Sequence, residues 1–252
     1  MLTCLPVEMD AGALRFRNEM LGITWGDAGE MKKIASVLLL LTQAGAGCSG
    51  GATVEERLAK YGEGVQARLA PLFTAQGIDY PPASVTLVGL KAEKKLHLYA
   101  RSKNGDVKLI KTYPILAASG TAGPKMREGD RQVPEGFYQI ESLNPNSRYH
   151  LSLRINYPNG EDKKHAEAEK RKKLGGDIMI HGKNASIGCL AMGDPASEEL
   201  FVLAAKTGLA NIEVLLCPVD FRANPGFQPP ESAPVWTSEL YRRLKMRLAQ
   251  FK

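Results

Sequence analysis

Apolar residues recur every three to four positions between residues 53 and 72. This spacing predicts an amphipathic helix whose apolar stripe is Val54, Leu58, Tyr61, Val65 and Leu69. Pro81 and Pro82 follow the helix, and two consecutive prolines mark a break in regular structure. We therefore expect an N-terminal helical segment over residues 47–82, followed by a separate region.

Beyond this boundary, short apolar runs alternate with turn residues, which is typical of β-strands. The runs that predict strands are 85–88, 96–100, 107–113, 137–140, 151–156, 177–181 and 212–217. Asn104-Gly105 predicts a hairpin between the second and third runs. Helices are predicted at 196–207, which Gly208 ends, and at 237–251, after an irregular Pro-rich stretch. The predicted fold class is mainly β (α+β), a mostly antiparallel β core with peripheral helices.

The N-terminal region carries the three parts of a secretory signal peptide. Two lysines follow Met31, residues 34–41 are apolar, and small residues end the segment at Ala46. We interpret 31–46 as the signal and Met31 as the biological start, so residues 1–30 read as a non-native or mis-assigned extension. The apolar run is too short to span a bilayer, and no integral membrane span is expected in the mature form. Cleavage after Ala46 predicts a soluble periplasmic protein, which we favour over a lipoprotein attached at Cys48.

The net charge of +6 and the pI of about 9.1 raise the question of nucleic-acid binding. Much of the positive charge lies in residues 163–173, where glutamates interrupt it and no aromatic residue is available for base stacking. We interpret this basic run as a solvated helix or a flexible loop and predict no nucleic-acid partner. A basic secreted protein would, however, be attracted to an anionic cell wall.

The main chemical signal is His181 at the end of an apolar run, with Cys189 eight residues later across a loop of small residues. A cysteine thiol becomes an efficient nucleophile when an imidazole takes its proton. Gly188 allows close backbone approach, and the amides of Gly188 and Cys189 could point at a developing oxyanion. Ser186 is suited to tie the loop down.

Cysteine and histidine also have other common roles in proteins. A single cysteine is often a small buried apolar residue, and a single histidine is often a core side chain. A zinc site needs three or four ligands at recognisable spacing, which the sequence lacks, so we predict no metal and no cofactor. The four cysteines fit no disulfide framework, and Cys217 lies in an apolar run that predicts a buried strand.

The residues around Cys189 resemble the signature of the YkuD-type L,D-transpeptidases, in which a His-Gly precedes Ser-X-Gly-Cys. Further segments resemble the smaller YafK-like murein branch of this family. They are 110–115, 119–125, 128–138, 156–159 and 191–194. The resemblance covers about residues 84–220 and implies a catalytic domain over 83–220, with residues 221–252 as a Pro-rich link and C-terminal helix.

Two positions depart from the commoner pattern of the family. Ile187 replaces a histidine before the Gly-Cys pair, and Ala191 replaces an arginine often found after the cysteine. The substrate contacts made by those two family residues therefore cannot be transferred to this chain.

The resemblance implies a role for each candidate site residue. Cys189 would form a thioester, and His181 would activate it, with the imidazole oriented by a backbone carbonyl and not by a carboxylate. Gly182, Ser186 and Gly188 would shape the loop and the oxyanion site. The residues expected to hold carboxylates and amides of the substrate are Asn156, Tyr157, Lys111 and Lys125. For Lys111 and Tyr157 an ordinary strand-edge role has equal weight, and the other histidines (His97, His150 and His165) lie outside the signature.

The function implied is that of a periplasmic cysteine L,D-transpeptidase acting on peptidoglycan stem peptides at meso-diaminopimelate. The acceptor is left open between a second stem peptide, a protein lysine, a D-amino acid and water. With water, the enzyme would be an L,D-carboxypeptidase, an endopeptidase or an activity that releases wall-linked lipoprotein. An alternative of another class is a non-catalytic peptidoglycan-binding protein that keeps the fold.

Overall fold

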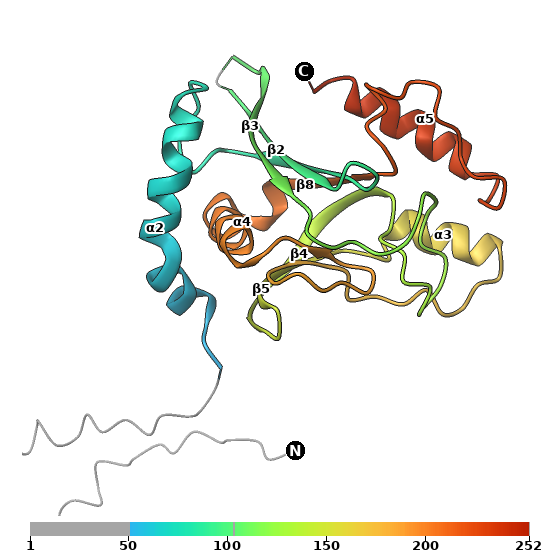
Figure 1. Ribbon diagram of the computed structural model, residues 1–252, viewed down its shortest axis with the longest axis horizontal. Helices are drawn as coiled ribbons and strands as arrows, with labels where there is room; N and C mark the ends of the chain where they lie inside the picture. The colour runs from blue at the N-terminus through green and yellow to red at the C-terminus, as the bar shows by residue number, and fades with distance from the viewer. Residues whose placement is uncertain (1–50, 103, 252) are drawn as a thin grey trace, which may run out of the picture. The chain divides into compact units, whose positions relative to one another are not determined.

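The described strands form one mixed sheet in the computed structural model, which describes residues 51–102 and 104–251. The order across the sheet is β3-β2-β1-β8-β4-β5-β6-β7. The strands are β1 (Val85–Leu90), β2 (Lys95–Arg101), β3 (Val107–Pro114), β4 (Gly136–Ser147), β5 (His150–Ile155), β6 (Met179–His181), β7 (Leu190–Ala191) and β8 (Ile212–Cys217). The helices are α2 (Val54–Thr74), α3 (Gly160–Ala168), α4 (Asp194–Thr207) and α5 (Thr237–Leu248), with a short 3-10 turn η2 (Leu209–Asn211) (Figure 1).

Most neighbouring strands run antiparallel, so the predicted fold class is confirmed. Only the β1–β8 and β6–β7 pairs are parallel among the described strands. The last strand of the chain, β8, lies between β1 and β4, so segments far apart in sequence meet at the centre of the sheet. The predicted hairpin between β2 and β3 is also confirmed.

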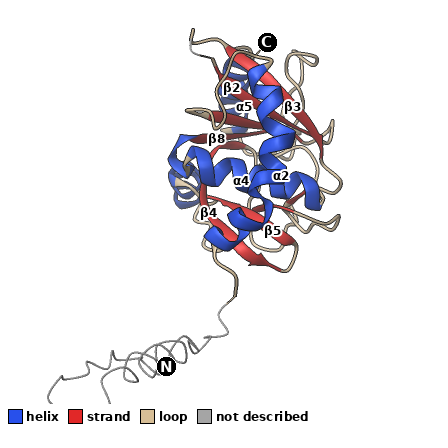
Figure 2. Cartoon of the chain, turned by 90° about the vertical axis from the view of Figure 1, so that its left-hand side faces the viewer, coloured by secondary structure: helices blue, strands red, loops and turns tan. Residues whose placement is uncertain are grey.

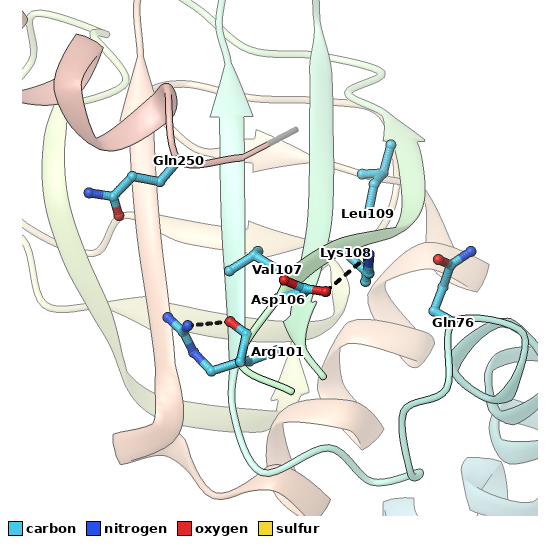
Figure 3. Close-up of a pocket in the computed structure, with 8 residues that line it drawn as sticks. Gln76, Arg101, Asp106, Val107, Lys108, Leu109 and Gln250 are labelled. Atoms are coloured by element: carbon cyan, nitrogen blue, oxygen red, sulfur yellow. Dashed lines mark hydrogen bonds and ion pairs between the residues drawn. The ribbon is translucent and has the colours of Figure 1, made fainter. Parts of the chain in front are cut away.

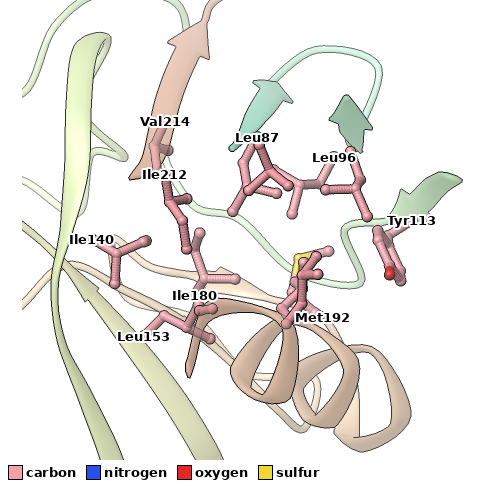
Figure 4. Packing of buried hydrophobic residues seen from close by; sticks show 14 of the residues in the cluster. Leu87, Leu96, Tyr113, Ile140, Leu153, Ile180, Met192, Ile212 and Val214 are labelled. Carbon is pink, nitrogen blue, oxygen red and sulfur yellow. The ribbon is translucent and has the colours of Figure 1, made fainter. Parts of the chain in front are cut away.

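The sheet is buried on both faces where β1 and β8 lie. In β8, Val214 and Leu216 belong to the core under α2 and α4, whereas Leu215 and Cys217 belong to the core under α5. This two-sided burial explains why β8 is apolar from Val214 to Cys217. Figure 2 shows α2 and α4 on the side of the sheet that faces the viewer. Figure 4 shows residues of the larger core, which extends from Leu87 to Ile180 and Met192 beside the catalytic loop.

The predicted helices form, with small changes at their ends. Thr53 and Glu56 form a capping box that starts α2, and the helix ends two residues later than predicted. Gly208 ends α4 with φ 85°, as predicted, because glycine adopts this left-handed backbone without strain. The C-terminal helix ends at Leu248, three residues before the predicted end.

Some predicted ranges require correction. Strand β4 continues seven residues beyond 140, through a polar stretch that contains Pro145 and lacks strand alternation. Its pairing with β5 is irregular in this part, so the hydrophobic pattern gives no signal for it. The strand predicted at 177–181 begins at Met179, and the strand predicted at 151–156 is 150–155. The basic run forms the end of α3 and the exposed loop after it.

The predicted signal peptide (31–46), the extension before it (1–30), Cys4 and Cys48 lie outside the described residues. Among the helices that the structure describes, none is both long enough and apolar enough to cross a bilayer.

Candidate active site

His181 is the last residue of β6 and is only 2% exposed. Its Nδ1 lies 2.6 Å from the carbonyl oxygen of Gly182. Because a carbonyl oxygen can only accept a hydrogen bond, Nδ1 carries the proton and Nε2 is left with its lone pair. The partner is a backbone carbonyl, of the kind that the family resemblance implies. This arrangement prepares Nε2 to accept a proton.

Cys189 lies directly before β7, where the parallel ladder between β6 and β7 fixes its place. Ile180 pairs with Leu190, so one step back places Cys189 beside Met179, on the same face of the sheet as His181. The thiol donates to the carbonyl oxygen of Asp177 at 3.5 Å, and no hydrogen bond joins it to the His181 ring among the described residues. Catalytic hydrogen bonds are often formed only when substrate binds.

The two side chains are neutral partners in this structure. Burial raises the pKa of the Cys189 thiol above its usual 9.0; a backbone hydrogen bond from Met179 and the charge of Lys125 oppose this shift only in part. Burial lowers the pKa of the His181 imidazole below its usual 6.5, against the effect of the Gly182 carbonyl. The site therefore holds a thiol and a neutral imidazole, which can act as a general base during attack.

The Ser186 side chain fixes the nucleophile loop. Its hydroxyl donates to the Cys189 carbonyl oxygen at 2.6 Å and accepts the Cys189 amide at 3.0 Å. The expectation that the Cys189 amide points at an oxyanion is therefore wrong in this structure, because Ser186 already binds that amide. The amide of Gly188 has no acceptor among the described residues. Gly188 has φ 108°, a backbone conformation that favours glycine, and is the remaining candidate for oxyanion binding.

Gly182 lies in a tightly packed position between the catalytic loop and the start of α4. A β-carbon there would lie 2.5 Å from Asp194 Oδ1, 2.7 Å from the Tyr149 carbonyl oxygen and 2.9 Å from Ser197 Oγ. The adjacent Lys183 amide donates to the same Asp194 oxygen at 2.8 Å. Only glycine fits here without moving the carbonyl that orients His181.

Tyr149 is a site residue that the sequence analysis missed. Its ring centroid lies 4.5 Å from that of His181, and its side chain is 39% exposed. It precedes β5, which pairs directly with β6 and so places the two rings together. No local pattern marks this tyrosine, and only knowledge of the β5–β6 register would have pointed to it.

Lys125 and Tyr157, two of the predicted substrate contacts, are buried. Lys125 is 7% exposed, and its ammonium donates to Asp130 Oδ1 at 2.6 Å and to the Arg127 carbonyl oxygen at 2.9 Å. Its charge nevertheless acts on Cys189, where it offsets part of the rise in pKa that burial causes. Tyr157 is 3% exposed and donates to the Leu174 carbonyl oxygen at 3.3 Å. Both residues therefore use, in contacts within the protein, the polar groups predicted to bind substrate.

Asn156 and Lys111, the other two predicted contacts, are also engaged within the protein. Asn156 Oδ1 accepts the Gln139 amide at 2.9 Å and so extends the pairing of β4 with β5. Lys111 Nζ lies 2.6 Å from Glu199 Oε2, which also accepts the Tyr113 hydroxyl at 2.9 Å. This places the Lys111 ammonium in an ion pair with α4. The structural interpretation of Lys111 is thus favoured over substrate binding.

The other histidines have partners of their own. His150 Nε2 lies 2.9 Å from Glu198 Oε1, His97 Nδ1 lies 3.0 Å from the Thr112 hydroxyl, and His165 stacks on Trp236 at 4.0 Å. Across residues 51–102 and 104–251, no three histidine, cysteine, aspartate or glutamate side chains are grouped as metal ligands.

A hollow of about 610 Å³ lies away from these residues (Figure 3). It is formed by the β2–β3 hairpin together with Gln76 after α2 and Gln250 after α5. Arg101 and Lys108 face it, but each has a polar partner within the hairpin. None of the candidate catalytic residues lines it.

Comparisons with known proteins identify the type of domain in this chain. A sequence model of the L,D-transpeptidase catalytic domain, named YkuD, matches residues 85–214. The protein named "Putative L,D-transpeptidase YafK" from Escherichia coli strain K12 is 39% identical over 113 residues, which are 44% of this chain. The match spans 43% of that relative's length, so this chain corresponds to less than half of the relative.

Two solved structures are similar to the chain at a lower level. The helical cell shape determining protein Pgp2 from Campylobacter jejuni is 24% identical with a TM-score of 0.44, over 53% of this chain and 47% of that one. Bd1075 from Bdellovibrio bacteriovorus is 19% identical with a TM-score of 0.40, over 66% of this chain and 55% of that one.

Proposed function

This chain belongs to the family of L,D-transpeptidase catalytic domains, and on that premise we propose that it is a periplasmic cysteine L,D-transpeptidase. Its substrates are peptidoglycan stem peptides, and its covalent intermediate is a thioester at Cys189. The observation that carries the proposal is the pairing of Cys189 and His181 on one face of the β6–β7 ladder. The Nε2 atom of that histidine is left unprotonated by the Gly182 contact.

The reaction follows from the protonation states of the two side chains. His181 Nε2 takes the thiol proton as the Cys189 sulfur attacks the carbonyl carbon of diaminopimelate. The Gly188 amide donates to the oxyanion, and the carbon–nitrogen bond then breaks as the imidazolium gives its proton to the departing amine. An acceptor amine attacks the thioester, and the sulfur recovers its proton through the same imidazole.

The proposed location rests on the signal-like segment 31–46 and on the charge of the protein. Exposed lysines after α3, together with a net charge of +6, favour association with an anionic wall. Amino-terminal sequencing of the protein from its native host tests the location. We expect a mature chain that lacks residues 1–46, and a mature chain that still begins at Met1 would contradict it.

The function is tested by incubating the protein with purified muropeptides and with sacculi that carry bound lipoprotein, followed by mass spectrometry. New cross-links through diaminopimelate are the expected products. Shortened stems or released lipoprotein without cross-links would show that the activity is that of a hydrolase and not that of a transferase. No change in any substrate, at a concentration that saturates binding, would favour a wall-binding protein. Cys189→Ala should abolish every product, and the matched variant Cys217→Ala should retain them.

A further inference from the structure

Arg131 is a strained, exposed cation beside the nucleophile loop. Its backbone has φ 55°, in the left-handed region that residues with a β-carbon rarely adopt. Its side chain is exposed, and the guanidinium has no hydrogen bond or ion pair to any residue that the structure describes. Strain of this kind persists only where the surroundings impose it, and it concentrates at functional sites.

The surroundings that impose this backbone are built on Asp130. Its carboxylate accepts the amides of Met126, Arg127 and Gln132 at 2.8, 2.9 and 3.0 Å. Burial alone would raise the pKa of this carboxyl, but the hydrogen bond from Lys125 and these backbone donors lower it overall. The turn is therefore held on both sides of Arg131 by one ionised side chain.

The same turn contacts the nucleophile loop. A β-carbon at Gly188 would lie 3.4 Å from the Gln132 carbonyl oxygen and 4.0 Å from the Arg131 carbonyl carbon. The backbone of Arg131 is thus next to the amide that we assign to the oxyanion. Gln132 is itself fixed, because its Oε1 accepts the Thr121 amide at 2.8 Å.

Two more left-handed residues that are not glycine lie in this region. Asp177, with φ 54°, provides the carbonyl oxygen that accepts the Cys189 thiol. Lys183, with φ 58°, follows Gly182 in the loop that begins at His181. Arg131, Asp177 and Lys183 are three of the six described residues other than glycine that have a left-handed backbone. Of these three, Arg131 brings a planar cation with several donors.

We propose that Arg131 binds a carboxylate of the donor stem peptide and so selects donors with a free carboxylate near the scissile bond. This inference rests on the proposed function, because it concerns the substrate of the same site. A guanidinium pairs with a carboxylate through two parallel hydrogen bonds, which fixes orientation as well as charge. Its ordered turn reduces the entropy lost when the substrate is positioned.

The test compares four donor tetrapeptides: one with every carboxylate free, and three in which the D-glutamate, the diaminopimelate or the terminal carboxylate is an amide. The key variant is Arg131→Gly, which removes the guanidinium and accepts the left-handed backbone, so folding is preserved. Arg127→Gly is the matched control, because it removes an exposed arginine from the same turn. Thioester formation at Cys189 is followed by intact-protein mass spectrometry.

We expect Arg131→Gly to reduce kcat/KM for the free donor by about 10- to 100-fold, the range for a lost hydrogen bond to a charged group. One of the three amidated donors should react equally well with both proteins, and that donor identifies the bound carboxylate. Arg131→Lys should recover part of the loss, and Arg127→Gly should behave as wild type. An equal loss on all four donors, or no loss on any, overturns the assignment. If the wild-type protein forms no thioester with any donor, the proposed function itself is wrong, which is a different result.

Discussion

Gly182→Ala tests whether the packing of the catalytic loop positions His181. The added methyl group would lie 2.5 Å from Asp194 Oδ1 and 2.7 Å from the Tyr149 carbonyl oxygen. Neither atom can move easily, since the first accepts the Lys183 amide and the second belongs to the backbone. Overpacking of this kind costs about 1–3 kcal/mol, which lowers Tm by roughly 2–12 °C for a domain of this size. The Gly182 carbonyl should shift, and the imidazole that it orients should shift with it.

A displacement of about 1 Å at a catalytic group can reduce the rate about 100-fold. We therefore expect Gly182→Ala to fold, to melt earlier and to acylate Cys189 far more slowly, as measured by circular dichroism and intact-protein mass spectrometry. Gly62→Ala is the matched control, because a β-carbon at that helical glycine meets nothing within 4 Å. It should raise stability by about 0.5–1 kcal/mol and leave acylation unchanged. The reasoning is refuted if Gly182→Ala retains both the wild-type Tm and the wild-type acylation rate.

Three further predictions follow from the site. Ser186→Ala removes both hydrogen bonds to the Cys189 backbone and should reduce the free energy of unfolding by about 1–3 kcal/mol in urea titrations; an unchanged midpoint would mean that Ser186 does not hold the loop. The acid limb of kcat/KM should have its midpoint below pH 6.5, because burial lowers the pKa of His181 and the neutral imidazole is the base, so activity extends toward acid pH; a midpoint above 6.5 would contradict this. Cys217→Ala should cost about 1–2 kcal/mol through lost packing while activity persists, and loss of turnover in a folded protein would count against the assignment of Cys189 alone.

Local patterns in the sequence predicted most of the individual elements. The predicted strand at 212–217 matches β8, the Thr53 side chain caps the start of α2, and Gly208 ends α4 because glycine adopts the left-handed backbone there. These signals depend on neighbours within a few residues, so they can be recognised without knowledge of the fold. The long polar half of β4 lacked such a signal and was missed.

The position of β8 between β1 and β4 could not be predicted from the hydrophobic pattern, because strand order depends on pairings between distant segments. The same limit applies to the site. His181, Ser186 and Cys189 were predicted from a single short segment, whereas Tyr149 comes from a strand pairing. Distant contacts also bury Lys125 and Tyr157 and form the Lys111–Glu199 ion pair. The sequence could therefore mark these residues as candidates for substrate binding by their type, but it could not show which partner each one has.

We propose that Cys189 becomes the thioester and that His181 is its base. The most direct measurement is intact-protein and peptide mass spectrometry of the protein quenched during turnover of a stem tetrapeptide, for wild type, Cys189→Ala and His181→Gln. We predict an adduct on Cys189. Its added mass should equal the mass of the donor minus the mass of the free amino acid that leaves. It should be absent in Cys189→Ala and strongly slowed in His181→Gln, with a smaller effect on an activated donor such as a β-lactam. Processing of the tetrapeptide by folded Cys189→Ala at the wild-type rate would contradict the covalent mechanism.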